Sequence, residues 1–323
     1  MKILIVTAMY PTPERPAFGT FVKEQVDSLK RAGVEIDVLV SSDGGGIKGY
    51  LEAVRALRRT LREKPYDIVH AHYGLTGMVA RMQARCPLVI TFHGSDLLGG
   101  VGSHYQYTLL GTITTIISKL AGLVATQRIV VARLLESKLW LRSAVIIPMG
   151  VDLSLFKPMP PPKAREQLGL DSGKRRVLFV AHPRNHTKRF DIAEAAVHLL
   201  QDDHPGVELL PVYDTPHHQI PLYMNACDVL VLTSMHEASP CVIKEAMACN
   251  LPIVSVNVGD VAERIDGVTD SYLCERTAQD VAAKLRLALQ HSRRTNGREK
   301  IASLSLSNVA QKVITIYENI LQT

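Results

Sequence analysis

A strand, a loop, a helix and a second strand are centred on residues 231–255, and this stretch most constrains the fold. Apolar runs at Asp228–Thr233 and Pro252–Val256 predict buried strands. A helix is expected between them, over Pro240–Cys249. Since a helix that joins two buried strands is typical of a parallel sheet, the stretch predicts an α/β fold.

The expected helix has clear signals at both ends. Ser239 can cap it, Pro240 stands where a missing N–H costs least, and Asn250 can adopt the left-handed conformation that ends it. Its start would lie at the carboxyl end of a parallel strand, where free N–H groups and the positive end of the helix dipole suit a phosphate.

Two glutamates flank this helix start. Glu237 lies in the loop before it, and Glu245 lies on the helix, on the same face as Cys241 and Ala248. The opposite, packing face is expected to consist of Val242, Ile243, Ala246 and Met247. Taken alone, Glu245 also fits an ordinary exposed acid on a good helix former.

The segment resembles the signature of the family 4 retaining glycosyltransferases, of the group 1 type, which have the GT-B fold. Their pattern is E-(G/A)-x-P-x-x-x-x-E-A-(M/L)-A. Ala238 stands where the family more often has glycine. The matching residues are Glu237, Pro240, Glu245, Ala246, Met247 and Ala248.

Two further segments resemble the same family. The segment from His93 to Asp96, HGSD, follows an expected strand and is similar to the family's HG(S/T)D motif, in which the histidine lies near the transferred sugar or the acceptor. A PxGVDxxxFxP motif at the family's interdomain linker is matched by Pro148, Gly150, Val151, Asp152, Phe156 and Pro158, with Met149 in place of the commoner asparagine.

The length of 323 residues allows two domains, each with its own core. The resemblance implies two doubly wound, Rossmann-like parallel-sheet domains facing across a cleft. We expect an acceptor-binding domain over residues 1–155, a donor-binding domain over 156–304, and a helix over 305–323 that crosses back to the first domain. Strands of the first domain are expected at 2–7, 35–40, 68–72, 88–92, 123–125 and 145–147.

The second domain opens with a strand over 175–181, and Arg184 and Lys188 lie between its end and the next helix. Cations at a helix start oppose the helix dipole, so their position favours binding of an anion. A solvated loop with incidental charge is the alternative. The family places an arginine and a lysine of this loop on the donor diphosphate.

The resemblance therefore implies one site for a nucleotide-diphosphate sugar. Glu245 would accept hydrogen bonds from the ribose, Arg184, Lys188 and the helix start would hold the diphosphate, and Glu237 would contact the sugar. His93 would reach in from the first domain, and Gly19 precedes a second helix start, before Phe21–Ala32. The implied catalytic residues are His93, Arg184, Lys188 and Glu237, and the implied donor-binding residues are Gly19, Arg184, Lys188, Glu237, Ala238, Ser239, Pro240, Cys241, Val242 and Glu245.

We expect no cofactor and no metal ion. The five cysteines are scattered without a CxxC pair, which fits a reducing cytoplasm, and no Asp-x-Asp lies in a suitable loop. His217 and His218 lack a third ligand at metal-binding spacing and are interpreted as loop residues. Retention of anomeric configuration is implied by the family. Because no carboxylate is evidently placed as a base on the acceptor, we expect front-face attack in which the diphosphate takes the acceptor proton.

The net charge of +6 is carried entirely by residues 1–155. Four arginines at helical spacing, Arg55, Arg58, Arg59 and Arg62, fit either a solvated face or contact with an anionic membrane. The apolar stretch Tyr107–Thr126 contains Lys119 and two glycines, so a packed or interfacial helix is expected there instead of a membrane span.

The expected partners are a nucleotide-sugar donor and a glycan, lipid-linked or small-molecule acceptor, as in cell-envelope polysaccharide synthesis. Nucleic acid is not expected. The expected location is the cytoplasm, with peripheral contact of the first domain with the inner face of the membrane as a further hypothesis.

Three other functions stay open at the level of the sequence. A retaining glycosidase also works with two carboxylates, although it has no use for Arg184 and Lys188. A sugar-nucleotide epimerase shares the two-domain architecture. A non-catalytic partner subunit would bind nucleotide without turnover.

Overall fold

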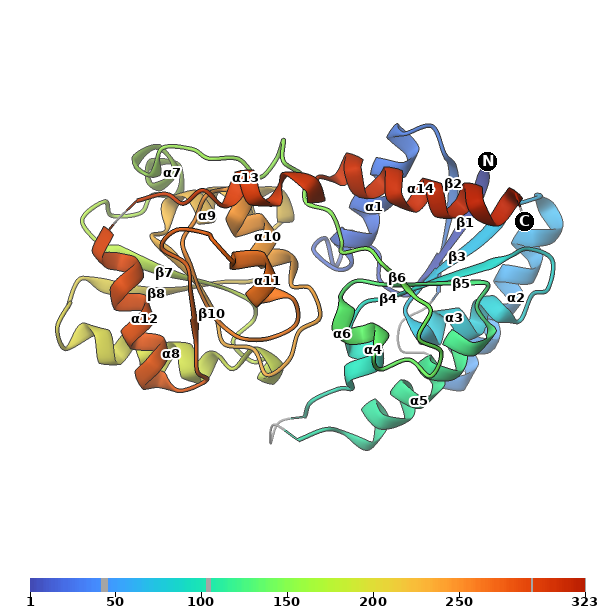
Figure 1. The fold of residues 1–323 in the computed structure, drawn as a ribbon, viewed down its shortest axis with the longest axis horizontal. Helices are drawn as coiled ribbons and strands as arrows, with labels where there is room; N and C mark the ends of the chain where they lie inside the picture. Colours follow the sequence, from blue (N-terminus) through green and yellow to red (C-terminus); the bar gives the residue numbers. More distant parts are fainter. Residues whose placement is uncertain (42–45, 103–105, 292, 323) are drawn as a thin grey trace. The chain divides into compact units, whose positions relative to one another are not determined.

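A computed structural model describes residues 1–41, 46–102, 106–291 and 293–322. The chain forms two compact units, Met1–Gly150 with Leu306–Thr323, and Val151–Ser305. Each unit contains one parallel sheet flanked by helices (Figure 1). The expected fold class, two doubly wound parallel-sheet domains, is thereby confirmed.

The sheet of the first unit has six strands in the order β2-β1-β3-β4-β5-β6, and all neighbours pair in parallel. Strands β3 and β4 are buried over their whole length, as central strands of parallel sheets usually are, and β3 buries two histidines, His70 and His72. The strands are β1 (Lys2–Thr7), β2 (Glu35–Val40), β3 (Ile68–His72), β4 (Leu88–Phe92), β5 (Gln127–Val130) and β6 (Val145–Ile146).

The helices of this unit lie on both faces of the sheet. The chain moves from β1 outward to β2 through α1 (Thr20–Arg31), then in the opposite direction through α2 (Gly46–Glu63), α3 (Gly74–Arg81) and α5 (Leu109–Val124). Because such crossovers are right-handed, α1 covers one face and the other three helices cover the second. Accordingly, α3 packs against both α2 and α5. Two short helices, α4 (Ser95–Leu98) and α6 (Arg133–Glu136), complete the unit.

The last helix, α14 (Leu306–Gln322), packs on α1 and contributes to the core of the first unit. The ring of Tyr317 is fully buried, and its hydroxyl lies 2.5 Å from Nδ1 of His70 on β3. The other ring nitrogen of His70 lies 2.8 Å from Oγ1 of Thr91 on β4. A polar chain therefore connects the end of the sequence to the centre of the first sheet.

The expected strand over 123–125 is wrong. Leu123 and Val124 are the last residues of α5, and the strand begins at Gln127. The apolar residues continue the helical periodicity, whereas the strand begins with two polar residues. The Arg128 side chain turns back to donate to the carbonyls of Gly122 and Ala125, which satisfies the end of the helix.

The segment around α5 is a helix, as expected. In the part of the chain that the structure describes, none of the helices combines the length and the apolar character needed to cross a bilayer.

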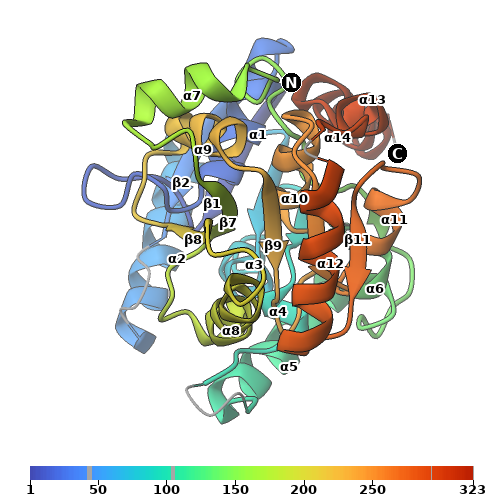
Figure 2. The same ribbon diagram turned by 90° about the vertical axis from the view of Figure 1, so that its left-hand side faces the viewer.

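The second unit has a five-stranded parallel sheet in the order β11-β10-β9-β7-β8. Helices α8 and α12 pack together (Figure 2), α7 packs on α9, and α10 packs on α13. The strands are β7 (Arg175–Val180), β8 (Val207–Val212), β9 (Val229–Leu232), β10 (Ile253–Val256) and β11 (Tyr272–Cys274). The helices are α7 (Pro161–Leu168), α8 (Phe190–Gln201), α9 (Ile220–Ala226), α10 (Cys241–Ala248), α11 (Val261–Ile265), α12 (Ala278–His291) and α13 (Gly297–Ile301).

The two units divide after Gly150 and after Ser305, whereas boundaries at 155 and 304 were expected. Val151 pairs with Ser305, and the Phe156 ring is buried beside His217. These contacts hold residues 151–156 in the second unit. The proline-rich stretch that follows is not an extended spacer, because Pro161 begins α7, where proline is favoured.

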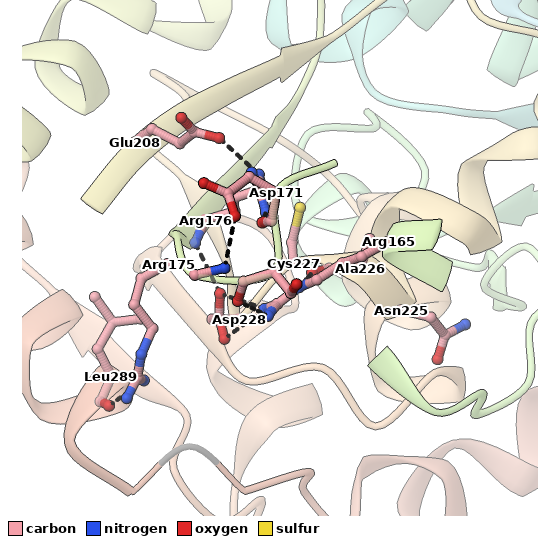
Figure 3. Close-up of polar contacts among 12 residues, drawn as sticks. Arg165, Asp171, Arg175, Arg176, Glu208, Asn225, Ala226, Cys227, Asp228 and Leu289 are labelled. Carbon is pink, nitrogen blue, oxygen red and sulfur yellow. Dashed lines mark hydrogen bonds and ion pairs between the residues drawn. The ribbon is translucent and has the colours of Figure 1, made fainter. Parts of the chain in front are cut away.

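A network of ion pairs holds the amino ends of β7 and β9 (Figure 3). Arg165 of α7 donates to both carboxylate oxygens of Asp228 at 3.0 and 3.1 Å, and the backbone N–H of Arg176 donates to the same carboxylate at 2.7 Å. The Arg176 side chain is buried, and its Nε lies 2.6 Å from Glu208. The network lies at the end of the sheet opposite to the carboxyl ends of the strands and stabilises the unit.

Replacing Asp228 by alanine should destabilise the protein by about 3 kcal/mol, because a partly buried guanidinium and a backbone N–H would lose their partner. The midpoint of urea unfolding followed by circular dichroism should fall by roughly 1 M. Asp203→Ala is the matched control, since its ion pair with Arg286 is exposed and should contribute less than about 1 kcal/mol. Equal midpoints for the two variants would contradict a structural role for the network.

Candidate functional site

The candidate site lies where the chain direction reverses in the second sheet. From β7 the chain crosses to β8 on one side and then to β9 on the other, so β7 and β9 are neighbours. In doubly wound sheets the loops after two such strands diverge and leave room for a ligand. Here these loops are residues 181–189 and 233–240.

Hydrogen bonds from one loop to backbone carbonyls of the other join the two loops. The hydroxyl of Thr233 donates to the carbonyls of Lys188 and Arg189, both at 2.9 Å. The N–H of Met235 donates to the carbonyl of Thr187 at 2.8 Å. The loops are therefore fixed to each other.

This arrangement brings together two of the expected site residues, Lys188 and Glu237. Their Nζ and Oε1 atoms are 2.5 Å apart, and Ser234 donates to the same carboxylate oxygen at 2.8 Å. Both side chains are mostly covered, with exposed fractions of 26% for Lys188 and 16% for Glu237. Lys188 is thus an oriented cation and not an incidental charge on a solvated loop.

Arg184 lies in the same loop, but its side chain is exposed. The backbone N–H of Arg184 donates to Nδ1 of His182 at 3.0 Å. The structure therefore does not bring its guanidinium into contact with Lys188 or Glu237.

Helix α10 begins at Cys241, with Pro240 at the N-cap position and Val242 in the first turn. The expected capping role of Ser239 is wrong. Because the helix starts one residue later than expected, Ser239 lies before the cap position, and its hydroxyl donates to Asp260 at 2.8 Å. The end of the helix is as expected, since Asn250 has a φ of 55°.

Beneath the helix start lies a buried charged group that sequence reasoning missed. Lys244 is 1% exposed and donates to the Ser239 hydroxyl at 3.2 Å, and Asp260 also accepts from Arg264 at 2.9 Å. Lys244 stands among the packing residues of α10, and a buried lysine requires a polar partner. That requirement was the available signal, although Asp260, which accepts from the Ser239 hydroxyl, is distant in sequence.

The loop between Glu237 and Ser239 is covered by Gly259. A Cβ atom at Gly259 would lie 2.2 Å from the carbonyl oxygen of Ala238, and the φ of 59° also favours glycine. Ala238 itself is buried, and its φ is not positive. Alanine therefore fits at this position without the backbone freedom of glycine.

Glu245 is largely buried on α10, with one carboxylate oxygen 3.0 Å from Nε2 of His217. The His217 ring lies against Phe156, at 5.2 Å between ring centres. Glu245 is therefore held in place and is not an ordinary surface acid. Among the residues that the structure describes, no group of three or more His, Cys, Asp or Glu side chains is arranged to hold a metal ion.

His93 follows β4 at the carboxyl edge of the first sheet. Its Nε2 lies 2.9 Å from Nδ1 of His72. Its ring also lies against the rings of Phe21 and Tyr73, at 5.0 and 4.7 Å between ring centres. Burial lowers the pKa of His72 to about 3, so His72 is neutral. The neutral His72 ring fixes the orientation of His93.

The loop that carries His93 is held by the carboxylate of Asp96, another residue whose role sequence reasoning missed. It accepts from the N–H groups of His93, Gly94 and Gly74 at 2.8 to 3.4 Å. Burial raises the pKa of Asp96 to about 6, although these hydrogen bonds act in the opposite direction. The carboxylate thus ties the end of β4 to the start of α3.

A cavity of about 210 Å³ lies at the same edge of the first sheet. Its polar lining includes Ser41, Tyr50, Tyr73, Thr76, Ser95 and Asp96. Gly19, the other expected site residue in this unit, precedes α1 with a φ of 72°, and a Cβ atom there would lie 2.4 Å from the carbonyl carbon of Met9. Gly19 and His93 belong to the first unit, and the remaining expected site residues belong to the second.

Two family models match the chain. Residues 18–155 match Glycosyltransferase Family 4, and residues 193–291 match Glycosyl transferases group 1. The matches fall in the first and second structural units respectively, apart from residues 151–155.

The chain is also similar to known glycosyltransferases. It is 25% identical to TuaC of Bacillus subtilis strain 168, a glycosyltransferase assigned by name to teichuronic acid biosynthesis, over 87% of each chain. Sucrose-phosphate synthase from Thermosynechococcus elongatus has the same fold, with a TM-score of 0.81, 19% identity and full coverage of both chains. HepE from Anabaena, solved in complex with UDP-glucose, has a TM-score of 0.73 and 19% identity, over 99% of this chain and 100% of the other.

The fold, the two family matches and these relatives agree. The chain belongs to the group 1 glycosyltransferases of the GT-B fold.

Proposed function

We propose that the protein transfers a hexose-type sugar from a nucleotide-diphosphate sugar to a glycan, lipid-linked or small-molecule acceptor, with retention of configuration and without a metal ion. The observation that carries this proposal is the ion pair of Lys188 with Glu237 beside the start of α10. An ammonium group has three N–H donors, so Lys188 can keep Glu237 and also bind a phosphate oxygen. The pair would then stand where the phosphate meets the sugar, with Glu237 facing the sugar hydroxyls.

The start of α10 would bind the diphosphate together with Lys188. The N–H groups of Cys241 and Val242 lie in the first turn of the helix, where the dipole favours an anion. The exposed guanidinium of Arg184 is proposed as a second cation for the same group. Cations and N–H groups held in place before reaction stabilise charge on a leaving phosphate better than solvent does.

Glu245 is proposed to bind the ribose. His217 contacts Oε1 of this carboxylate, which leaves Oε2 for a ribose hydroxyl. The support from other proteins is that HepE binds UDP-glucose on the same fold.

In the proposed reaction an acceptor hydroxyl attacks the anomeric carbon from the side of the leaving group. The bond between that carbon and the phosphate oxygen breaks as the new glycosidic bond forms. The released nucleoside diphosphate takes the acceptor proton, so no protein base is required. Lys188 and the α10 start would stabilise the negative charge that develops on the diphosphate.

The acceptor is proposed to bind the first unit, in the cavity beside the His93 loop. The polar residues of this lining carry mostly hydroxyl groups, which suit a hydroxylated acceptor such as a sugar. The similarity to a protein of teichuronic acid biosynthesis supports a cell-envelope glycan as the acceptor. His93, oriented by His72, is the residue of this unit that we propose to contact the acceptor.

The donor site is tested by thermal shift with a panel of nucleoside diphosphates, their sugars and inorganic pyrophosphate. A ligand at a hundred times its dissociation constant should stabilise the protein by about 2.7 kcal/mol. Glu245→Ala should weaken nucleoside diphosphate binding about ten- to a hundredfold but leave pyrophosphate binding unchanged, because only the ribose contact is lost. Glu194→Ala, an exposed acid on α8, is the control. Equal loss for both ligands would contradict the ribose assignment.

Lys188→Ala should weaken both nucleoside diphosphate and pyrophosphate, and lower turnover by about 10²- to 10³-fold, because charge on the leaving group would lose its nearest cation. Initial rates of nucleoside diphosphate release measure the effect. Lys174→Ala is the control, since this lysine forms an exposed ion pair with Glu208. Turnover within twofold of the unaltered protein in Lys188→Ala would exclude Lys188 from the site.

The course of the reaction can be measured on the glycoside product. Nuclear magnetic resonance should show the anomeric configuration of the donor, and an inverted linkage would contradict the proposed mechanism. Excess EDTA should leave the rate unchanged, because protein cations hold the diphosphate. Donor incubated without acceptor should keep its sugar unaltered, which separates transfer from epimerisation.

A further inference from the structure

Helix α5 has an unusual distribution of side chains over its two faces. The side that packs on the protein consists of small residues, among them Gly111, Ser118, Ala121 and Gly122, all buried. A Cβ atom at Gly74 of α3 would lie 2.3 Å from Ser118, so the two helices approach closely. The protein side of α5 therefore requires small residues.

Seven of the large apolar residues of α5 lie on the opposite side and are exposed, with exposed fractions between 38% and 77%. Their spacing of three and four residues places them on one stripe along the helix. In an ordinary surface helix such a stripe faces the core, whereas here it faces away from the protein. The residues of this α5 stripe are Leu109, Leu110, Ile113, Ile116, Leu120, Leu123 and Val124.

A turn over residues 137–143 lies beside the carboxyl half of α5. A Cβ atom at Gly122 would lie 3.1 Å from the Leu139 side chain, and Arg128 donates both to the Gly122 carbonyl and to the Ser143 hydroxyl. Trp140 in this turn is 52% exposed. Trp140 is therefore an exposed ring in a turn that packs on α5, and an indole ring suits the boundary between water and lipid.

The sequence around the stripe is positively charged. Residues 107–145 contain five basic residues against the single acid Glu136, and the basic residues are Lys119, Arg128, Arg133, Lys138 and Arg142. A second copy of the chain related by a two-fold axis would bring like charges together around the stripe. An anionic lipid surface is complementary to the same residues.

We propose that the α5 stripe inserts into the interface of a membrane containing anionic lipid. The 16-residue helix would lie in the plane of the membrane, because no described helix is long and apolar enough to span it. The surrounding basic residues would contact lipid headgroups while the stripe contacts the acyl-chain boundary. The inference does not rest on the proposed donor site, which belongs to the second unit.

The test is sedimentation of the full chain with vesicles of phosphatidylcholine alone and with vesicles in which about a third of the lipid is phosphatidylglycerol. The unaltered protein should bind the anionic vesicles more tightly, and added salt should weaken that binding. Replacing Ile113, Ile116 and Leu120 together by glutamine should weaken binding at least tenfold. These residues are already 42% to 46% exposed, so folding should be retained.

A matched triple variant replaces Leu199, Leu287 and Leu321 by glutamine. These leucines are 38% to 45% exposed and lie outside α5, so vesicle binding should be unchanged. Circular dichroism and the melting temperature of both variants establish that they are folded. Absence of binding by the unaltered protein, or equal binding by the two triple variants, would overturn the proposal. Equal binding to neutral and anionic vesicles would overturn its electrostatic part.

Trp140 gives an independent readout, because it is the only tryptophan of the chain. Its fluorescence should shift to shorter wavelength on addition of anionic vesicles and should be quenched by brominated acyl chains. Light scattering without lipid tests the alternative that a second copy of the chain covers the α5 stripe. A dimer that the α5 triple variant abolishes would assign the stripe to contact between two copies and overturn the membrane proposal.

Discussion

The parallel pairing of β7 with β9 is the contact on which the candidate donor site depends. Because β7 and β9 lie side by side, the loops that follow them also lie side by side. In the sequence these loops are separated by α8, β8 and α9. The Thr233 hydroxyl then joins these loops, and Lys188 meets Glu237. The ion-pair network around Asp228 holds the opposite ends of the same strands. The position of the site therefore follows from the strand order. Buried ion pairs stabilise the amino ends of the two strands, and the candidate site lies at their carboxyl ends.

Much of this fold is predictable from local pattern. Apolar runs with short connections define the strands of both sheets, and proline and asparagine mark the limits of α10. What the pattern leaves open depends on partners distant in sequence. Ser239 has the chemistry of a cap, but Asp260, which comes from beyond β10, accepts its hydrogen bond instead. The Ser239 hydroxyl also accepts from buried Lys244, so it links residues 244 and 260, which no local rule connects.

The strand assigned to 123–125 and the orientation of α5 show a second limit. Periodicity predicts that a segment is helical and which residues share a face, but it does not say which face the protein covers. In α5 the close approach of α3 selects the small residues as the packing side. For the site, the residue types were predictable from the glutamate pattern and from the cations near a helix start. The pairing of His217 with Glu245 was not predictable, because it depends on the fold of the whole second unit.

The contact of Tyr317 with His70 has a consequence for how the chain matures during synthesis. The second unit is one continuous segment, residues 151–305, and it contains all of its own strands. The first unit is discontinuous, since its core includes α14 from the end of the sequence. A ribosome makes the chain from the amino end, so residues 1–150 emerge before Tyr317, the hydrogen-bonding partner of His70, has been synthesised. The unit whose synthesis begins first is consequently the one completed last.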